Sequence, residues 1–170
     1  MAISKKMEEA FNAQINAEAF SAYLYLSMSA YFEDANLPGF ASWMKAQAQE
    51  EVFHAMKMYS FVVERGGRVT LAAIDAPETK WESTTAVFEA TLTHEEHVTS
   101  LINKLVILAR EENDQAAEVF LHWFVNEQVE EEATADEWLQ KVKMVETNPG
   151  AMYFVDREAA TRIFTPPAAE

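Results

Sequence analysis

The sequence predicts an all-α protein: a four-helix bundle with one long crossover between the second and third helices, and a short fifth helix after the fourth. Three observations lead to this prediction. Proline and glycine, which destabilise the interior of a helix, are few and clustered. The intervals between the clusters are long, and strand-like alternation of apolar and polar residues is hard to find in them. One connection is much longer than the others.

The helix breakers divide the chain into a few intervals. The five prolines and four glycines stand at Pro38-Gly39, Gly66-Gly67, Pro77, Pro149-Gly150 and Pro166-Pro167. The interval 82–147 would make a single helix of about 100 Å, which is too long for a compact domain. We therefore expect this interval to break at "EENDQ", where Asn113 or Asp114 can cap a new helix.

Five helices follow from these breaks. The four long helices are expected at about residues 4–34, 39–65, 83–111 and 114–146. Each would be roughly 40–45 Å long, and helices of similar length pack well side by side. The fifth is expected at about residues 150–163, with apolar side chains on one side at Met152, Val155, Ala159 and Ile163.

The lengths of the connections indicate which helices are neighbours. A short link, "EDANLPG", joins the first two helices, and a shorter one joins the third to the fourth, so each pair should be antiparallel. The link "GGRVTLAAIDAPETKWE" has about 16 residues. At up to about 3.4 Å per residue it can run the whole length of the bundle.

Composition limits the kinds of function. The chain has 170 residues, 49% of them apolar, and we expect a single domain over residues 1–170 with its core bundle at about 4–146. The absence of cysteine excludes a disulfide framework, an iron–sulfur cluster and a thiol nucleophile. We expect no signal peptide and no membrane-spanning stretch, and therefore a cytoplasmic location. The net charge of −15, from 28 acidic and 13 basic residues, argues against nucleic-acid binding and is compatible with cationic ligands.

Polar residues interrupt the apolar stripe of each long helix near its middle. They are Glu18 on the first helix, Glu51 and His54 as a Glu-x-x-His pair on the second, Glu95 on the third, and Glu127, Gln128 and Glu131 on the fourth. Buried carboxylates without partners cost several kcal/mol each and repel one another. No basic residue lies on these stripes at this level. A pair of divalent cations would balance the charge, and oxygen ligands with an imidazole suit iron, manganese or zinc.

The alternative interpretation is structural. A single Glu-x-x-His pair is common on helices, and a cluster such as residues 130–132 is usually a solvated face. His94, His97 and His122 are expected at the surface or around the ligands. The coincidence of carboxylates at one level of four helices favours a di-metal site over this alternative.

Four stretches of the sequence carry a resemblance to a known family: "QINAEAFSAYLYLSMSAYF", "QAQEEVFHAMKMYSFVVERGGRV", "THEEHVT" and "FLHWFVNEQVEEE". Over about residues 4–165 the chain resembles the ferritins, and among them the bacterial non-haem ferritins. The resemblance implies a ferritin-like bundle that stores iron. It also implies a ferroxidase reaction, in which O2 or peroxide oxidises Fe(II) at a di-iron centre, and a shell of 24 identical subunits that encloses ferric mineral.

The resemblance also implies roles for individual residues. Glu18, Glu51 and His54 match the first iron site, with Glu51 bridging the two irons. Glu95 matches the ligand of the second iron, and Glu131 an additional ligand.

Further positions match the surroundings of this centre. Gln128 lies close to it, and Tyr25 matches a tyrosine that can hydrogen-bond a ligand or be oxidised. A third iron site of bacterial members is matched by Glu50, Glu127, Glu130 and Glu131.

The sequence departs from parts of the family pattern. Gln128-x-x-Glu131 stands where a bacterioferritin would repeat Glu-x-x-His, and Val52 follows Glu51 in place of the methionine that holds haem there. We therefore expect no haem. Glu118 matches an acid of the threefold channels, and Leu121 stands where a second channel acid is expected, which leaves the selectivity of the channel open.

Two other functions remain open at this point. One is a di-iron or di-manganese oxidase of the same bundle fold that stores no mineral and binds about two metal ions per chain. The other is a non-catalytic bundle that associates with partners and binds no metal tightly.

Overall fold

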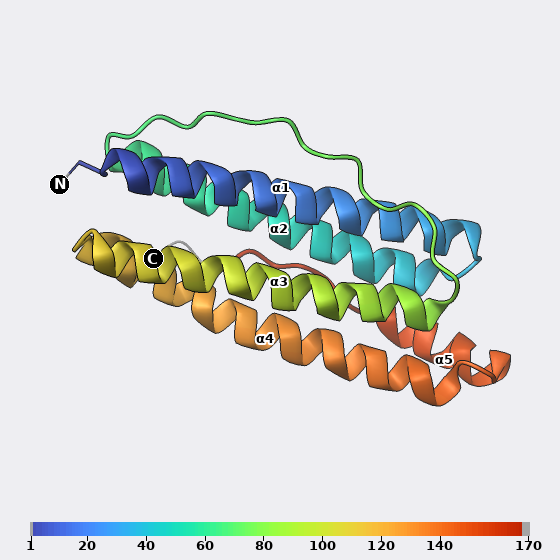
Figure 1. Ribbon diagram of the computed structural model, residues 1–170. Coiled ribbons are helices and arrows are strands. Elements are labelled where there is room, and N and C mark those ends of the chain that lie inside the picture. Colours follow the sequence, from blue (N-terminus) through green and yellow to red (C-terminus); the bar gives the residue numbers. More distant parts are fainter. Residues whose placement is uncertain (1, 168–170) are drawn as a thin grey trace.

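The protein is a bundle of four long helices with a short fifth helix at one end (Figure 1). This computed structural model describes residues 2–167, so residues 1 and 168–170 of the expected domain lie outside the described part. The helices are α1 (Lys5–Asp34), α2 (Pro38–Glu64), α3 (Thr84–Glu111), α4 (Gln115–Val145) and α5 (Pro149–Ala159). Residues 2–167 contain no strand. The predicted all-α fold is confirmed, and the four long helices end within one residue of the expected positions.

Side-chain caps explain where four of the helices begin. An Asn, Asp or Ser side chain accepts a hydrogen bond from a backbone N–H of the first turn and so satisfies a donor that the helix leaves free. The capping residues are Ser4 for α1, Ser83 for α3, Asp114 for α4 and Asn148 for α5. Asp114 is one of the two caps expected from the sequence.

The N-terminus of α2 lacks a cap of its own, and α5 supplies one. Leu37 precedes α2 and makes no side-chain capping bond. Instead, the backbone N–H of Phe40 donates to Oδ1 of the buried Asp156 on α5, at 2.9 Å. A Cβ atom at Gly39 would lie 1.7 Å from the carbonyl oxygen of Asp156. Glycine therefore allows α5 to dock against α2, and this contact fixes the start of the C-terminal segment.

The long connection between α2 and α3 runs back along α1, as predicted (Figure 1). Its backbone is held by side chains on the outer face of α1. The Nδ2 atom of Asn12 donates to the carbonyl of Arg68 at 3.0 Å, and Nδ2 of Asn16 donates to that of Ala73 at 3.0 Å. Residues 70–76 are all exposed. The connection thus joins two antiparallel hairpins, α1–α2 and α3–α4, and contributes little to the core.

The core consists of two apolar clusters with a polar layer between them. The cluster beside α5 contains Phe32, Phe40, Trp43, Phe88 and Trp138, and the cluster at the opposite end contains Met7, Phe11, Phe61, Ile102 and Phe124. The polar layer consists of the buried residues Gln14, Glu18, Glu51, His54, Glu95, Gln128 and Glu131. At the middle of the bundle, four buried carboxylates therefore occupy positions that apolar side chains fill elsewhere in the core.

One prediction about the C-terminal end is wrong. The fifth helix ends at Ala159 and does not reach residue 163. The N–H of Arg162 bonds the carbonyl of Ala159 in a tight turn, and the chain then becomes extended. Ile163 is consequently 82% exposed and does not share a face with Met152.

Within residues 2–167, no helix combines the length and the apolar character that a membrane crossing requires.

Candidate metal centre

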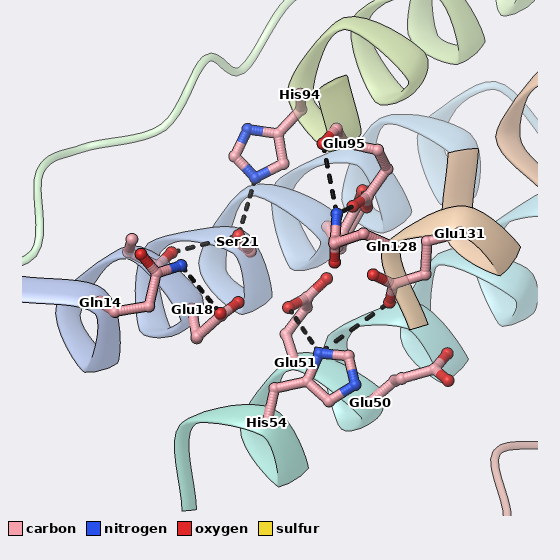
Figure 2. Close-up of polar contacts among 12 residues, drawn as sticks. Gln14, Glu18, Ser21, Glu50, Glu51, His54, His94, Glu95, Gln128 and Glu131 are labelled. Carbon is pink, nitrogen blue, oxygen red and sulfur yellow. Dashed lines mark hydrogen bonds and ion pairs between the residues drawn. The ribbon is translucent and has the colours of Figure 1, made fainter. Parts of the chain in front are cut away.

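The polar layer brings ligand-type side chains from all four long helices to one point (Figure 2). Glu51 and His54 lie one turn apart on α2 and so share a face. Glu18 comes from α1, Glu95 from α3 and Glu131 from α4. None of the five is more than 6% exposed. The structure therefore places together the residues that the sequence predicted for the two primary sites.

These side chains form overlapping groups of three. In each group, one ligand atom from every residue lies within 4.8 Å of the others. The groups are Glu18–Glu51–His54, Glu51–Glu95–Glu131 and Glu50–His54–Glu131. Glu51 belongs to the first and second groups, as a residue that bridges two cations must.

The carboxylates of this layer are poorly supplied with hydrogen bonds. Both oxygens of Glu51 and of Glu131, and Oε2 of Glu18, are buried without a hydrogen-bond partner. The nearest nitrogen to Glu51 in an ion-pair contact is Nδ1 of His54, 3.5 Å from Oε2. A buried carboxylate oxygen without a donor costs free energy that a coordinated cation would recover. The set of hard oxygens with one imidazole nitrogen fits divalent first-row metals.

The protonation states follow from burial and crowding. Burial, and then the charges of Glu131, Glu95 and Glu18, raise the pKa of Glu51 well above its usual range. Burial, followed by Glu95 and Glu50, does the same to the pKa of Glu131. Burial raises the pKa of Glu95 to about 7 and also raises that of Glu18. Without a cation the layer therefore retains protons near neutral pH.

The pKa of His54 shifts in the opposite direction, which leaves its imidazole able to bind metal. Burial, aided by the positive charge of Lys57, lowers the pKa of His54 to about 4. The imidazole is therefore neutral at pH 7, so its contacts with Glu51 and Glu131 are not ion pairs there. A neutral imidazole has a free nitrogen lone pair, which is the form that binds metal.

Neighbouring side chains orient two of the carboxylates. The Nε2 atom of Gln14 donates to Oε1 of Glu18 at 2.9 Å. The Tyr25 hydroxyl donates to Oε1 of Glu95, and Nε2 of Gln128 donates to Oε2 of Glu95 at 3.3 Å. Tyr25 and Gln128 thus lie where the sequence predicted them. Gln14 was not predicted from the sequence, although it stands one turn before Glu18 on the same stripe.

His94 lies behind this layer, next to Tyr25. Its Nε2 atom is 2.7 Å from the Ser21 hydroxyl, and its ring centroid is 6.0 Å from that of Tyr25. Burial lowers the pKa of His94 to about 4, so it is neutral at pH 7. His94 supports Tyr25 from the side and belongs to none of the three ligand groups.

The predicted third site is only partly assembled. Glu50 joins His54 and Glu131 in the third group. Glu127 is half-buried and Glu130 is exposed, and neither belongs to a ligand group found among residues 2–167. The charges of Glu130 and Glu50 nevertheless add to burial in raising the pKa of Glu127.

The position that the resemblance matches to a second channel acid faces inward. Leu121 is fully buried in the apolar cluster with Phe124, so this position faces the core of its own bundle. Glu118, one turn earlier, is partly exposed, and its Oε1 accepts from Nε of Arg110 at 2.7 Å.

Comparison with known proteins identifies the family. The family model described as Ferritin-like domain matches residues 8–145 of the chain. The chain belongs to the ferritin family. This membership also confirms the predicted function at the level of the family: the protein is an iron-storage ferritin.

Similar ferritins are known from bacteria and an archaeon. A bacterial non-heme ferritin of Bacteroides fragilis is 44% identical over 160 residues, which cover 94% of this chain and 99% of that one. The one from Staphylococcus aureus strain MRSA252 is 36% identical over 162 residues, covering 95% and 98%. A solved structure of an open pore ferritin from Archaeoglobus fulgidus superposes with a TM-score of 0.93 at 51% identity, covering 94% of this chain and 98% of that one. An engineered closed form of the same archaeal ferritin gives a TM-score of 0.95 at 51% identity, covering 96% and 100%.

Proposed function

We propose that this ferritin is a ferroxidase that takes up two Fe(II) ions per chain, oxidises them with O2 or peroxide, and delivers Fe(III) to a mineral inside a shell. The observation that supports this most strongly is the buried layer of carboxylates on four helices, several of whose oxygens have no hydrogen-bond partner. Hard anionic oxygens stabilise Fe(III) more than Fe(II), so the layer would favour the oxidation of the bound substrate.

Each residue of the layer has a distinct task in this proposal. Glu18 and His54 hold the first iron, Glu95 and Glu131 hold the second, and Glu51 bridges them. Binding of the two cations displaces the protons that the crowded carboxyl groups retain near neutral pH.

Two neighbours position these ligands. Tyr25 and Gln128 hold Glu95 through hydrogen bonds and so fix the second position before iron arrives. Such supporting contacts commonly change metal affinity or activity by about 10- to 100-fold.

Assembly into a homo-oligomeric shell of 24 subunits, in the cytoplasm, is part of the same proposal. The Archaeoglobus relatives include one described as an open pore ferritin and one engineered into a closed form. At a net charge of −15 per chain, a shell would attract cations through its pores, and added salt would weaken this attraction.

Iron loading separates this proposal from the rival functions. Metal-free protein is loaded aerobically with increasing Fe(II), and its mass is measured by light scattering after size exclusion. A storing ferroxidase gives a mass far above that of a dimer and holds many more than two irons per chain. An oxidase without storage stops at about two, and a non-catalytic bundle retains none. A clean monomer at micromolar concentration would contradict the shell.

The third iron site is tested by Glu130→Ala. Glu130 is exposed and lies outside the groups that contain the primary ligands, so the fast oxidation of the first two irons should be largely unchanged. The later phase or the ratio of iron oxidised to O2 consumed should change, as stopped-flow absorbance and oxygen-electrode measurements would show. The matched control is Glu137→Ala, which removes an exposed acid of the same helix that pairs with Lys141. Loss of the fast phase in Glu130→Ala would show that the assignment is wrong.

A further inference from the structure

The segment that follows α5 returns along α2 toward the metal centre. We call residues 160–167 the C-terminal strap; Figure 1 shows it running from α5 back toward the middle of the bundle. Its direction is set by the docking of α5 at Gly39 and by the tight turn after Ala159. Successive side chains of an extended chain point to opposite sides. Accordingly, Arg162 and Phe164 are half-buried whereas Ile163 is exposed.

The inward side chains of the strap contact α2 beside the ligands. The ring of Phe164 is 5.9 Å from that of Phe53, which in turn lies 6.3 Å from the ring of His54. The Arg162 guanidinium lies over the Trp43 ring, 4.7 Å from its centroid. Its Nη2 atom donates to Oε2 of Glu50 at 2.7 Å.

Glu50 links the strap to the carboxylate layer. It forms a ligand group with His54 and Glu131. Its side chain is only 17% exposed and that of Arg162 only 24%, so the ion pair is partly shielded from water. A guanidinium remains charged at all working pH values. Arg162 therefore places a permanent positive charge on one ligand of the third group, next to the position where a third cation would bind.

We propose that Arg162 is a tethered counter-cation of the third metal position: it holds Glu50 while that position is free, and a third metal ion must compete with it for this carboxylate. The inference rests on the proposed function, because the third ion is part of it. Arg162 is a positioning residue that acts through Glu50. When the ion binds, the guanidinium is displaced from Glu50 and changes its contact with Trp43.

The magnitude of the competition follows from the exposure of the pair. Partly exposed ion pairs contribute little, so removing the Arg162 charge should tighten binding of the third ion by about two- to fivefold. The affinity for the two primary ions should change less, because Arg162 pairs with Glu50 and not with Glu18, Glu51 or Glu95. Lys57, whose charge reaches His54 and Glu127, remains in all variants and does not contribute to the difference.

The test uses the full-length assembled protein, freed of metal, with Zn(II) as the probe because Zn(II) has no redox chemistry. Calorimetry would give the number and affinity of bound ions. The variants are Arg162→Gln, Arg162→Lys and the control Arg157→Gln, which removes an exposed arginine of α5 that contacts Tyr153.

The expected result is a third Zn(II) that binds about two- to fivefold more tightly in Arg162→Gln alone. Arg162→Lys and Arg157→Gln should match the unmodified protein.

Two other results would count against the inference in different ways. Equal or weaker binding of the third ion in Arg162→Gln, with two tight ions retained, would overturn the role of Arg162 and leave the proposed function intact. Fewer than two tight ions in the unmodified protein would overturn both.

Discussion

Replacing Glu51 by alanine is expected to slow the oxidation of Fe(II) on the order of 100-fold or more, because in the proposed assignment one substitution removes a ligand from both iron positions. Stopped-flow absorbance after anaerobic loading and mixing with O2 would measure this loss. His54→Ala should have a smaller effect, since in the proposed assignment His54 holds only the first iron and Glu51 would still bridge the two irons.

The same substitution should not lower the thermal stability of the metal-free protein. Glu51 is 1% exposed, and neither of its oxygens has a hydrogen-bond partner. Removing it relieves burial and repulsion, so the variant should melt no lower than the unmodified protein. A carboxylate held by a buried salt bridge would predict the reverse, a loss on the order of 3 kcal/mol or more.

The control for both measurements is Gln47→Ala. Gln47 lies one turn before Glu51 on α2, is 2% exposed and belongs to none of the ligand groups. It reports the cost of truncating a buried polar side chain at this level, and oxidation should remain fast. Unimpaired oxidation together with a lowered melting temperature in Glu51→Ala would show that Glu51 is structural and that the centre is misplaced.

Removing metal is expected to cost more stability at about pH 7.5 than at about pH 5.5. In the metal-free protein the pKa of Glu95 is raised from 4.5 to about 7. A raised carboxyl pKa contributes stability that is fully present below pH 4.5 and lost as the pH rises through about 7. The loss for this one group is about 3 kcal/mol at most. Bound metal keeps the carboxylate ionised, which removes the loss, and saturating metal adds about 2.7 kcal/mol per site at 100 times Kd.

The two buried histidines act in the opposite sense. Burial lowers the pKa of His54 and of His94 to about 4. The stability that these neutral histidines contribute is therefore present above pH 6.5 and lost as the pH falls through about 4. Comparing the protein with Glu95→Gln at each pH cancels their contribution.

Melting curves with and without Zn(II) at several pH values would measure the effect. The metal-free Glu95→Gln variant should gain stability relative to the unmodified protein as the pH rises from about 5 to about 7.5. A difference between the two proteins that does not change with pH would contradict the raised pKa of Glu95.

Local signals explain why the helices, and the residues that meet in the polar layer, could be predicted. Ser4, Ser83 and Asp114 cap helices through contacts within three residues, so the boundaries depend on nearby sequence. The proposed ligands could be found because each interrupts an apolar stripe at mid-helix, and four helices of similar length bring their middles to one level.

Other features depend on contacts between distant residues. The pairing of Arg162 with Glu50 spans 112 positions and requires α5 to dock first at Gly39, which no local pattern reveals. The same docking leads the chain away from a helix after Ala159, so the predicted end at residue 163 was wrong. The burial of Leu121 was not foreseen, because a resemblance fixes a position in the sequence and not the side of the helix that it occupies.

The exposed connection between α2 and α3 has a consequence for dividing the chain. A cut within residues 70–76 would yield two helical hairpins, each with one side of the core exposed. The first would carry Glu18, Glu51 and His54, and the second Glu95 and Glu131, so neither fragment holds the group that Glu51 forms with α3 and α4. Association of the two fragments would then be the step that forms the Glu51–Glu95–Glu131 group. A cation that binds there would hold the two fragments together. The affinity for that cation would therefore depend on how favourably the fragments associate.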